Sequence, residues 1–462
     1  MEYIGLTEIR GGSLIVLEGV ISPSYEEVVS IRVDGYKEKL GRVVQIFGDK
    51  VIIQVFEGAG ELTPHNTVTR FTGRPMEIKL SEEILGRVFD GLGRPIDGMG
   101  DVFAECRRDI NGKAINPVSR VYPRNFIQTG ISAIDGLATL IRGQKLPIFS
   151  GDGLPHDQLA AQIVRQASLG LGSGDNFAVV FAAMGVKYDA ADYFRRSFED
   201  SGAIERVVMF LNLANDPVVE RVITPRAALT AAEYLAYEKG MHILVILTDM
   251  TSYAEALREI SSSRGEIPSR KGYPGYLYSE LASLFERAGI VRNGTGSVTQ
   301  IPILTMPNDD ITHPVPDLTG YITEGQIVLE RGVHQKSVYP PINILPSLSR
   351  LMKDGIGEGY TRKDHPDLAN QIFSSYARVN DVRALASVIG EDELSDLDRR
   401  YIEFGSMLET RFINQSRYEN RNMAETIQLG WEILGLLPRS ELDRVKTELL
   451  DEYYKPRAIN DF

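Results

Sequence analysis

The chain has 462 residues, of which 43% are hydrophobic and 24% charged, and a formal net charge of −13. This length favours about three domains over a single core, and the acidic balance argues against nucleic acid as a partner, because domains that bind phosphate backbones carry a basic excess. No apolar run approaches the roughly 20 residues of a membrane-spanning helix. The opening residues lack the pattern of a signal peptide, and the single Cys106 excludes an intramolecular disulfide.

Residues 1–73 are predicted to form a small antiparallel barrel or sandwich. Short runs rich in β-branched residues lie at 14–17, 28–33, 41–46 and 51–56, and Gly-containing turn signals separate them. Short runs at such regular spacing are typical of all-β domains. No residue of this segment carries a recognisable chemistry, so we expect it to be structural.

Residues 74–345 are predicted to form a doubly wound α/β domain. Continuous apolar runs, which suit parallel strands covered on both faces, occupy residues 145–149, 177–185, 207–214, 242–249 and 300–306. Between them lie segments with apolar residues at helical spacing, as in the stretch from Leu159 to Ala167. An alternation of strand and helix favours a parallel sheet with helices on both sides.

Residues 346–462 are predicted to form a helical domain. No strong strand run remains beyond residue 350. Amphipathic segments begin near residues 369, 398 and 422, and the apolar periodicity of each is that of a helix with one buried face.

The stretch IFSGDGLPHDQLA at 148–160 has the setting of a phosphate-binding loop, a strand followed by a Gly-rich turn and a helix. Gly151 and Gly153 keep the turn tight, but His156 stands where the lysine is expected and Asp157 where the magnesium-binding hydroxyl is expected. A carboxylate about 4 Å from a phosphate charge costs on the order of 4 kcal/mol at an effective dielectric of 20. We expect Asp157 to cap its own helix instead, and the loop to bind triphosphate weakly or not at all.

Two further positions bear on nucleotide chemistry. Asp249 ends the run at 242–249, where phosphate-loop enzymes hold magnesium through a carboxylate, although a lone Asp at a strand end is as often a helix cap. A water-activating carboxylate is expected after the run at 177–185, but Val186 stands there and valine cannot accept a proton. The domain therefore lacks both the lysine and the base of a hydrolase.

The segment NDDITHPVPD could be mistaken for a metal site, because it contains Asp309, Asp310, His313 and Asp317. Its prolines and Asx residues favour an ordinary turn, and no metal is expected. The acidic segment GEDELSDLD at 390–398 is interpreted from its residues as a solvated turn, with Ser395 beginning the next helix.

Together, several longer segments carry a specific resemblance: those at 85–98, 128–136, 142–156, 224–260 and 340–350, the last reading PPINILPSLSR. On these segments the chain resembles, essentially from end to end, the B subunits of archaeal-type and vacuolar-type rotary ATPases, which are their non-catalytic ring subunits. The resemblance implies an N-terminal β-barrel, a central RecA-like domain with a degenerate phosphate loop, and a C-terminal helical domain.

The resemblance also implies partners. It places the chain in a hexameric ring that alternates it with the catalytic A subunit, around central axle subunits and beside peripheral stalk subunits. Contact with the membrane would run only through the ion-translocating sector, so the expected location is the cytoplasmic face of the cell membrane. The loops at 308–317 and 390–398 would face the axle. No cofactor is expected to be required, and weak ATP or ADP binding at the loop and Asp249 stays open.

The resemblance assigns Arg350 as an arginine finger that points into the neighbouring subunit's site and acts there in trans. Judged from the sequence alone, one arginine among many is more often a surface ion pair. Tyr321 matches a position that faces the same site, although an aromatic residue there could equally pack in a core. The implied function is ATP synthesis or hydrolysis coupled to ion transport.

Two alternatives remain at the level of sequence. An autonomous homohexameric P-loop ATPase with an aberrant phosphate loop would need a cation at the phosphates, which His156 supplies only when protonated. A purely structural spacer in the ring would need no arginine finger.

Overall fold

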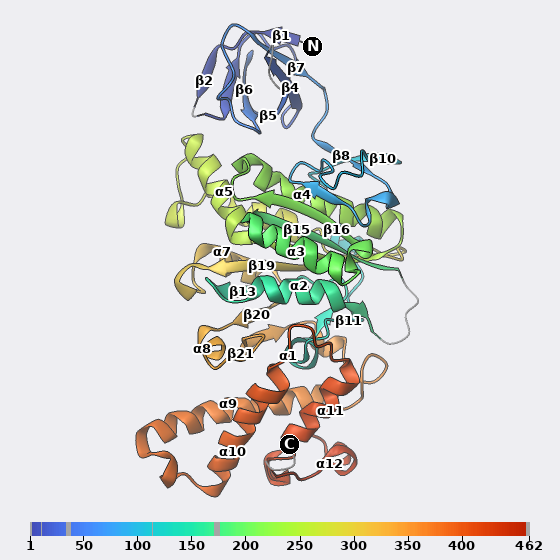
Figure 1. Ribbon diagram of the computed structural model, residues 1–462, viewed down its shortest axis with the longest axis vertical. Coiled ribbons are helices and arrows are strands. Elements are labelled where there is room, and N and C mark those ends of the chain that lie inside the picture. The colour runs from blue at the N-terminus through green and yellow to red at the C-terminus, as the bar shows by residue number, and fades with distance from the viewer. Residues whose placement is uncertain (1, 11, 34–37, 113, 171–175, 459–462) are drawn as a thin grey trace.

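The computed structural model describes residues 2–10, 12–33, 38–112, 114–170 and 176–458, in three tiers along one long axis (Figure 1). The N-terminal strands form the top tier, a sheet flanked by helices forms the middle, and the C-terminal helices form the bottom. The turn signal at 34–35 lies outside the described residues. Within the described residues, no helix is both long and apolar enough to cross a membrane.

The top tier is an antiparallel seven-stranded sheet in the order β1-β7-β4-β5-β6-β3-β2. Its strands are β1 (Glu2–Ile4), β2 (Glu8–Arg10), β3 (Leu14–Leu17), β4 (Val28–Val33), β5 (Lys39–Phe47), β6 (Lys50–Val55) and β7 (Thr67–Phe71). The four predicted runs are confirmed as β3 to β6. Fully buried aliphatic side chains, among them Ile15, Val29 and Ile53, fill its interior, so this tier has a core of its own.

The middle tier is built on a nine-stranded sheet in the order β21-β20-β13-β19-β17-β15-β16-β9, with β18 paired to β19. The strands are β9 (Val88–Asp90), β13 (Ile148–Gly151), β15 (Phe177–Val186), β16 (Val207–Leu213), β17 (His242–Thr248), β18 (Gly289–Ile290), β19 (Ser297–Met306), β20 (Gly325–Leu329) and β21 (Ile342–Ser349). Pairing is parallel except at β18 and β21. All five predicted apolar runs form strands here, and the sheet extends past residue 345 to Ser349.

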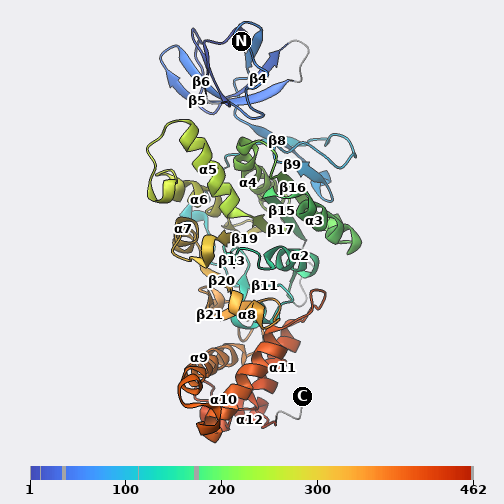
Figure 2. The same cartoon turned by 60° about the vertical axis from the view of Figure 1, so that its left-hand side comes forward.

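Helices cover both faces of this sheet (Figure 2). They are α1 (Ser132–Leu137), α2 (His156–Gln166), α3 (Tyr188–Asp200), α4 (Val218–Glu233), α5 (Met250–Ser263), α6 (Leu277–Phe285), α7 (Pro314–Ile322) and α8 (Arg331–Gln335). Along β15, Val179 and Phe181 pack with the core under α2 and α3, whereas Val180 packs with the core under α4 and α5. Because both faces are buried, every position of the strand is apolar.

Smaller sheets join the tiers. A two-stranded antiparallel sheet of β8 (Glu77–Leu80) and β10 (Cys106–Asp109) lies below the barrel. A second small sheet has three strands: β11 (Phe126–Gln128), β12 (Leu140–Ile141) and β14 (Ser168–Leu169).

The bottom tier is helical, as predicted. It contains α9 (His365–Ile389), α10 (Asp396–Met407), α11 (Met423–Leu434) and α12 (Thr447–Tyr453). Ser395 begins α10 as expected, since its hydroxyl accepts a hydrogen bond of 3.1 Å from the backbone N–H of Asp398. The core under α2 continues into these helices through Ile134 and Ile372, so the middle and bottom tiers are packed against each other.

Candidate functional site

The predicted phosphate-type loop is present between β13 and α2. β13 ends at Gly151 and α2 begins at His156, and Gly153 adopts a φ of +76°, which suits glycine. A Cβ atom added to Gly151 would collide with the carboxylate of Asp309. The backbone therefore favours glycine at 153, whereas at 151 glycine leaves room for the Asp309 side chain.

The polar residues of the loop face one another and not an open anion site. Nδ1 of His156 lies 3.1 Å from the hydroxyl of Ser150, and Nε2 lies 3.6 Å from Oδ1 of Asp157. The prediction that Asp157 caps its helix is wrong. Pro155 precedes the helix without a side-chain cap, and in the described residues the carboxylate of Asp157 makes no capping hydrogen bond. Its charge still lies in the first turn of α2, where the helix dipole favours an anion.

A guanidinium lies over the loop, which the sequence did not indicate. Nη2 of Arg331 donates to the carbonyl oxygen of Asp152 at 2.8 Å, and Nε donates to Oδ2 of Asp309 at 2.9 Å. The hydrogen bond and charge of Arg331 hold the pKa of the Asp309 carboxyl below its usual range. The one cation seen beside the loop in the described residues is thus already neutralised by a carboxylate.

Asp249 serves mainly as a helix cap. Its Oδ1 accepts a 2.7 Å hydrogen bond from the backbone N–H of Thr251 at the start of α5, and its Oδ2 accepts one of 2.6 Å from the hydroxyl of Thr305. Burial raises the pKa of this carboxyl, against the effect of those donors. Val186 ends β15, as expected, where a water-activating carboxylate would be needed. Neither position provides a free base.

Arg350 lies at the opposite end of the sheet from the loop. It follows β21, which runs antiparallel to β20 and pairs Ser349 with Gly325 at the start of that strand. The loop follows the other end of β13, which is parallel to β20. Gly151, Gly153, His156, Asp157 and Asp249 therefore share one edge, and Arg350 cannot serve the loop of its own chain.

The Arg350 guanidinium is exposed, and the hydrogen bonds that this residue donates within the described residues go to backbone carbonyl oxygens. Its backbone N–H donates to the carbonyl oxygen of Glu324 at 2.9 Å, and Nη1 lies 3.4 Å from the carbonyl oxygen of Thr323. The carboxylate of Glu324 is held by Lys145, whose Nζ lies 3.0 Å from it. Among the described residues no acidic side chain forms an ion pair with Arg350, so its charge faces outward.

Tyr321 belongs to the same edge as Arg350. It is 74% exposed, near the end of α7, and is two residues from Thr323, which Arg350 contacts. An exposed ring of this kind is not packed in a core of this chain. The structure thus brings the two candidate interface residues together, apart from the loop.

The acidic residues around 309–317 are all engaged by other groups. Asp310 accepts from Thr312 and from Lys271, and these contacts lower its pKa to about 2. Asp317 lies 3.5 Å from Arg270, and the imidazole of His313 accepts from the backbone at the start of α7. Over the described ranges, no group of three or more His, Cys, Asp or Glu residues is placed to hold a metal ion.

Three family models match the three tiers in order. Residues 11–73 match the beta-barrel domain of the ATP synthase alpha/beta family, and residues 130–349 match the nucleotide-binding domain of that family. Residues 354–454 match the C-terminal domain of V and A type ATP synthase. The RecA-type region and the helical region were both expected from the sequence.

Relatives that match over nearly their full length belong to the same family of ATP synthase subunits. The chain is 62% identical to the V-type ATP synthase beta chain 2 of Clostridium tetani, over 98% of this chain and 99% of that protein. It is 56% identical to the B subunit of the A-type ATP synthase of Aeropyrum pernix, over 98% of this chain and 97% of that protein. Among solved structures, the ATP synthase subunit NeqB from Nanoarcheaum equitans is 40% identical, with a TM-score of 0.73 over 92% of this chain and 100% of that chain. The chain therefore belongs to the ATP synthase alpha/beta family and, within it, to the B subunits or beta chains of V-type and A-type ATP synthases.

Proposed function

We propose that the chain is a non-catalytic ring subunit, which alternates with the catalytic A subunit and supplies Arg350 in trans to its neighbour's ATP site. The observation that carries the proposal is the position of Arg350, exposed, without an acidic partner among the described residues, and at the opposite end of the sheet from its own loop. A cation in that position does not reach the loop of its own chain and is available to a site on a neighbouring chain. The ring would then couple ATP synthesis or hydrolysis to ion transport.

A guanidinium suits this role. It stays charged at physiological pH, and it can donate two parallel hydrogen bonds to phosphate oxygens. Arginine fingers supplied in trans raise turnover by roughly 10³- to 10⁵-fold, because they stabilise the charge that develops on the transferred phosphoryl group. Tyr321, on the same edge, would contact the neighbouring chain beside that site.

The loop of this chain fits a non-catalytic role. His156 and Asp157 face each other, Arg331 is paired with Asp309, and Asp249 caps α5. We infer that this chain requires no cofactor of its own and binds ATP or ADP weakly at most. Its other proposed contacts are the central axle and peripheral stalk subunits. It would reach the cytoplasmic face of the membrane only through the ion-translocating sector.

The proposal is tested by Arg350→Gln in the assembled complex. ATP turnover should fall by roughly 10³-fold or more, while nucleotide still binds the catalytic partner. Lys353→Gln is the matched control, because Lys353 is an exposed cation three residues away with no ion pair among the described residues. Turnover of Arg350→Gln within about tenfold of the unaltered complex would mean that the chain is a structural spacer.

The isolated chain provides a second test. It should hydrolyse magnesium-ATP negligibly, and calorimetric titration should show little or no binding heat at millimolar nucleotide. Hydrolysis by the isolated chain that is abolished by His156→Ala would instead establish an autonomous ATPase.

A further inference from the structure

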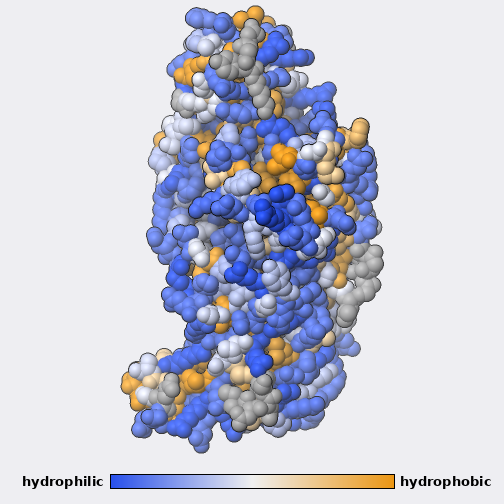
Figure 3. Space-filling view, in the orientation of Figure 1, coloured by the Kyte–Doolittle hydropathy of each residue, from blue (hydrophilic) through white to orange (hydrophobic). Residues whose placement is uncertain are grey.

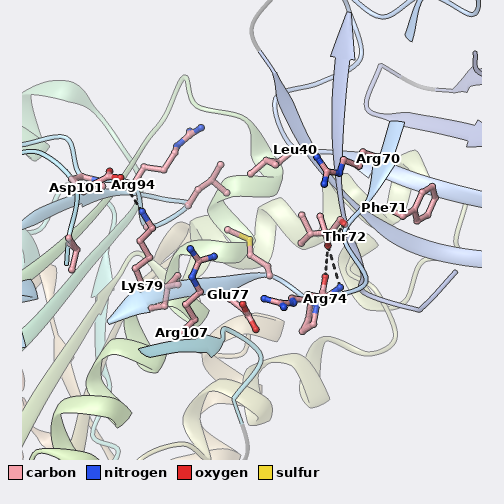
Figure 4. Close-up of a pocket in the computed structure, with 18 residues that line it drawn as sticks. Leu40, Arg70, Phe71, Thr72, Arg74, Glu77, Lys79, Arg94, Asp101 and Arg107 are labelled. Carbon is pink, nitrogen blue, oxygen red and sulfur yellow. Dashed lines mark hydrogen bonds and ion pairs between the residues drawn. The ribbon is translucent and has the colours of Figure 1, made fainter. Parts of the chain in front are cut away.

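A hollow of about 740 Å³ lies where the barrel meets the middle tier (Figure 4). Its walls come from the barrel, from the connection after β7, from the two-stranded sheet of β8 and β10, and from the segment between β9 and β10. Figure 4 shows Arg70 reaching from the barrel on one side and Arg107 rising from the two-stranded sheet on the other. Two tiers of the molecule therefore contribute side chains to one surface.

The hollow has an excess of positive charge, although the chain as a whole is acidic. Five Arg and Lys side chains line it but only two carboxylates, Glu77 and Asp101. Arg70, Arg74 and Arg107, hereafter the arginine cluster, are exposed and form no ion pair among the described residues.

Two other cations of the hollow are already engaged: Lys79 with Asp101 at 3.0 Å, and Arg94 with Asp90 at 2.6 Å. Lys79 also stands directly opposite Arg107 in the two-stranded sheet. The residue paired with Arg107 across the strands is therefore a cation and not a carboxylate.

The segment between β9 and β10 lines the hollow through Pro95, Asp101 and Val102, and it also carries exposed apolar side chains. Ile96, Met99 and Phe103, in the segment between β9 and β10, are 53%, 70% and 84% exposed. Figure 3 shows hydrophobic side chains at the surface over the region where Figure 1 places β8 and β10. Arginine, methionine and aromatic residues are the types enriched in protein interfaces, and arginine and aromatics also dominate their energetic hot spots.

We propose that the arginine cluster and these three apolar residues form a docking surface for a protein partner within the complex. The occupant is a segment that carries two or more carboxylates and at least one large apolar side chain. The inference rests on the proposed place of the chain in a multi-subunit ring. Docking there would fix the barrel relative to the middle tier, because both tiers line the hollow.

A protein segment fits the lining better than a small inorganic anion does. Leu40, Phe71 and Met76 form apolar walls beside the arginines, and a phosphate group would leave those walls in water. A polypeptide would bury the apolar walls and satisfy the guanidinium groups together.

The first experiment compares two variants in the complex co-expressed with its other head subunits. One is the triple variant Arg70→Gln, Arg74→Gln and Arg107→Gln, and the control is Arg10→Gln with Lys50→Gln, barrel cations that do not line the hollow. Native mass spectrometry should show the triple variant assembling roughly tenfold more weakly, since each surface charge contributes modestly. Its assembly should also depend less on NaCl, whereas the control should match the unaltered complex.

The second experiment identifies the occupant. A photoreactive benzoylphenylalanine at position 103 in the complex should cross-link to an acidic segment of a different chain. Cross-links only to another copy of this chain, or to no chain, would overturn the proposal. So would tight pyrophosphate binding by the isolated chain that the triple variant abolishes while assembly is unchanged.

The outcomes separate this inference from the proposed function. Thermal unfolding of the isolated triple variant should be unchanged or shifted upward, which excludes misfolding as the cause of weak assembly. If the triple variant assembles normally while Arg350→Gln still abolishes turnover, the docking surface is refuted and the arginine finger stands.

Discussion

The buried imidazole of His365 makes the joint between the middle and bottom tiers sensitive to acid. Nε2 lies 2.9 Å from the carbonyl oxygen of Gly136 in α1, and Nδ1 lies 3.1 Å from the hydroxyl of Thr361. Because a carbonyl oxygen only accepts, Nε2 carries the proton and Nδ1 accepts from Thr361. Burial lowers the pKa of His365 from 6.5 to about 4, so the folded chain keeps this ring neutral.

The size of the effect follows from linkage. The unfolded chain binds a proton at His365 below about pH 6.5, whereas the folded chain does so only below about pH 4. Stability from this group is fully present above pH 6.5, declines as the pH falls toward 4, and changes no further below that. The whole difference corresponds to about 3 kcal/mol, of which about 2 kcal/mol falls between pH 7 and pH 4.5.

The single tryptophan, Trp431, provides the assay. Its indole N–H donates to the carboxylate of Asp364, the residue before His365, and its side chain is 3% exposed. Urea unfolding followed by Trp431 fluorescence should show the unaltered chain losing about 2 kcal/mol more than His365→Gln between pH 7 and pH 4.5. Glutamine is the control because it hydrogen-bonds without titrating. Parallel losses in the two chains, within about 0.5 kcal/mol, would refute the reasoning.

Three other substitutions test separate parts of the structure. Arg287 is 1% exposed, and its Nε and Nη2 donate to Glu233 at 2.7 Å. The substitution Arg287→Met should lower the free energy of unfolding by about 3–5 kcal/mol, measured by thermal unfolding. Recovery of stability in the double variant Arg287→Met with Glu233→Met would show that the unpaired carboxylate is responsible. Gly151→Ala should displace the Asp309 side chain from the loop and lower the free energy of unfolding by about 1–3 kcal/mol. Amide hydrogen exchange at the start of α2 should become faster, and unchanged exchange there would contradict this. Ser395→Ala should weaken the start of α10 by about 1 kcal/mol, seen as local exchange in that helix but not in α11.

The sequence predicted those parts of the fold whose physics is local or periodic. Strands buried on both faces have to be apolar at every position, so β15 and β17 were visible as continuous runs. β1, β2 and β7 were missed because they are only three to five residues long and mix polar with apolar residues. A short strand of that kind gains its stability from neighbours that a sequence window does not contain.

For the candidate site, too, the sequence predicted the features that depend on neighbouring residues and missed those that join distant parts of the chain. The positions of Gly151, His156 and Asp249 followed from a strand, a turn and a helix that are contiguous in the chain. The ion pair between Arg331 and Asp309 joins different elements, and no local sequence pattern predicts it. The capping role expected of Asp157 failed because capping depends on the backbone before the helix, which Pro155 sets.

The absence of an acidic partner for Arg350 among the described residues was also beyond the sequence. The neighbouring carboxylate of Glu324 is engaged by Lys145, a residue 179 positions earlier in the chain. The only hint was Lys145 itself, a charged residue at the start of an apolar run. A buried lysine needs an acidic partner, but the sequence does not say which one.

The place where β21 ends has a mechanical consequence. Only residues 350–364 separate the last strand of the sheet from α9, and Arg350 is the first of them. If the bottom helices swing while the sheet stays still, this connection has to bend or twist to follow them. Arg350 itself is anchored to the sheet, because its backbone N–H donates to the carbonyl oxygen of Glu324 at 2.9 Å. The bending therefore falls on the residues that follow it, and the proposed arginine finger keeps its place while the helices move.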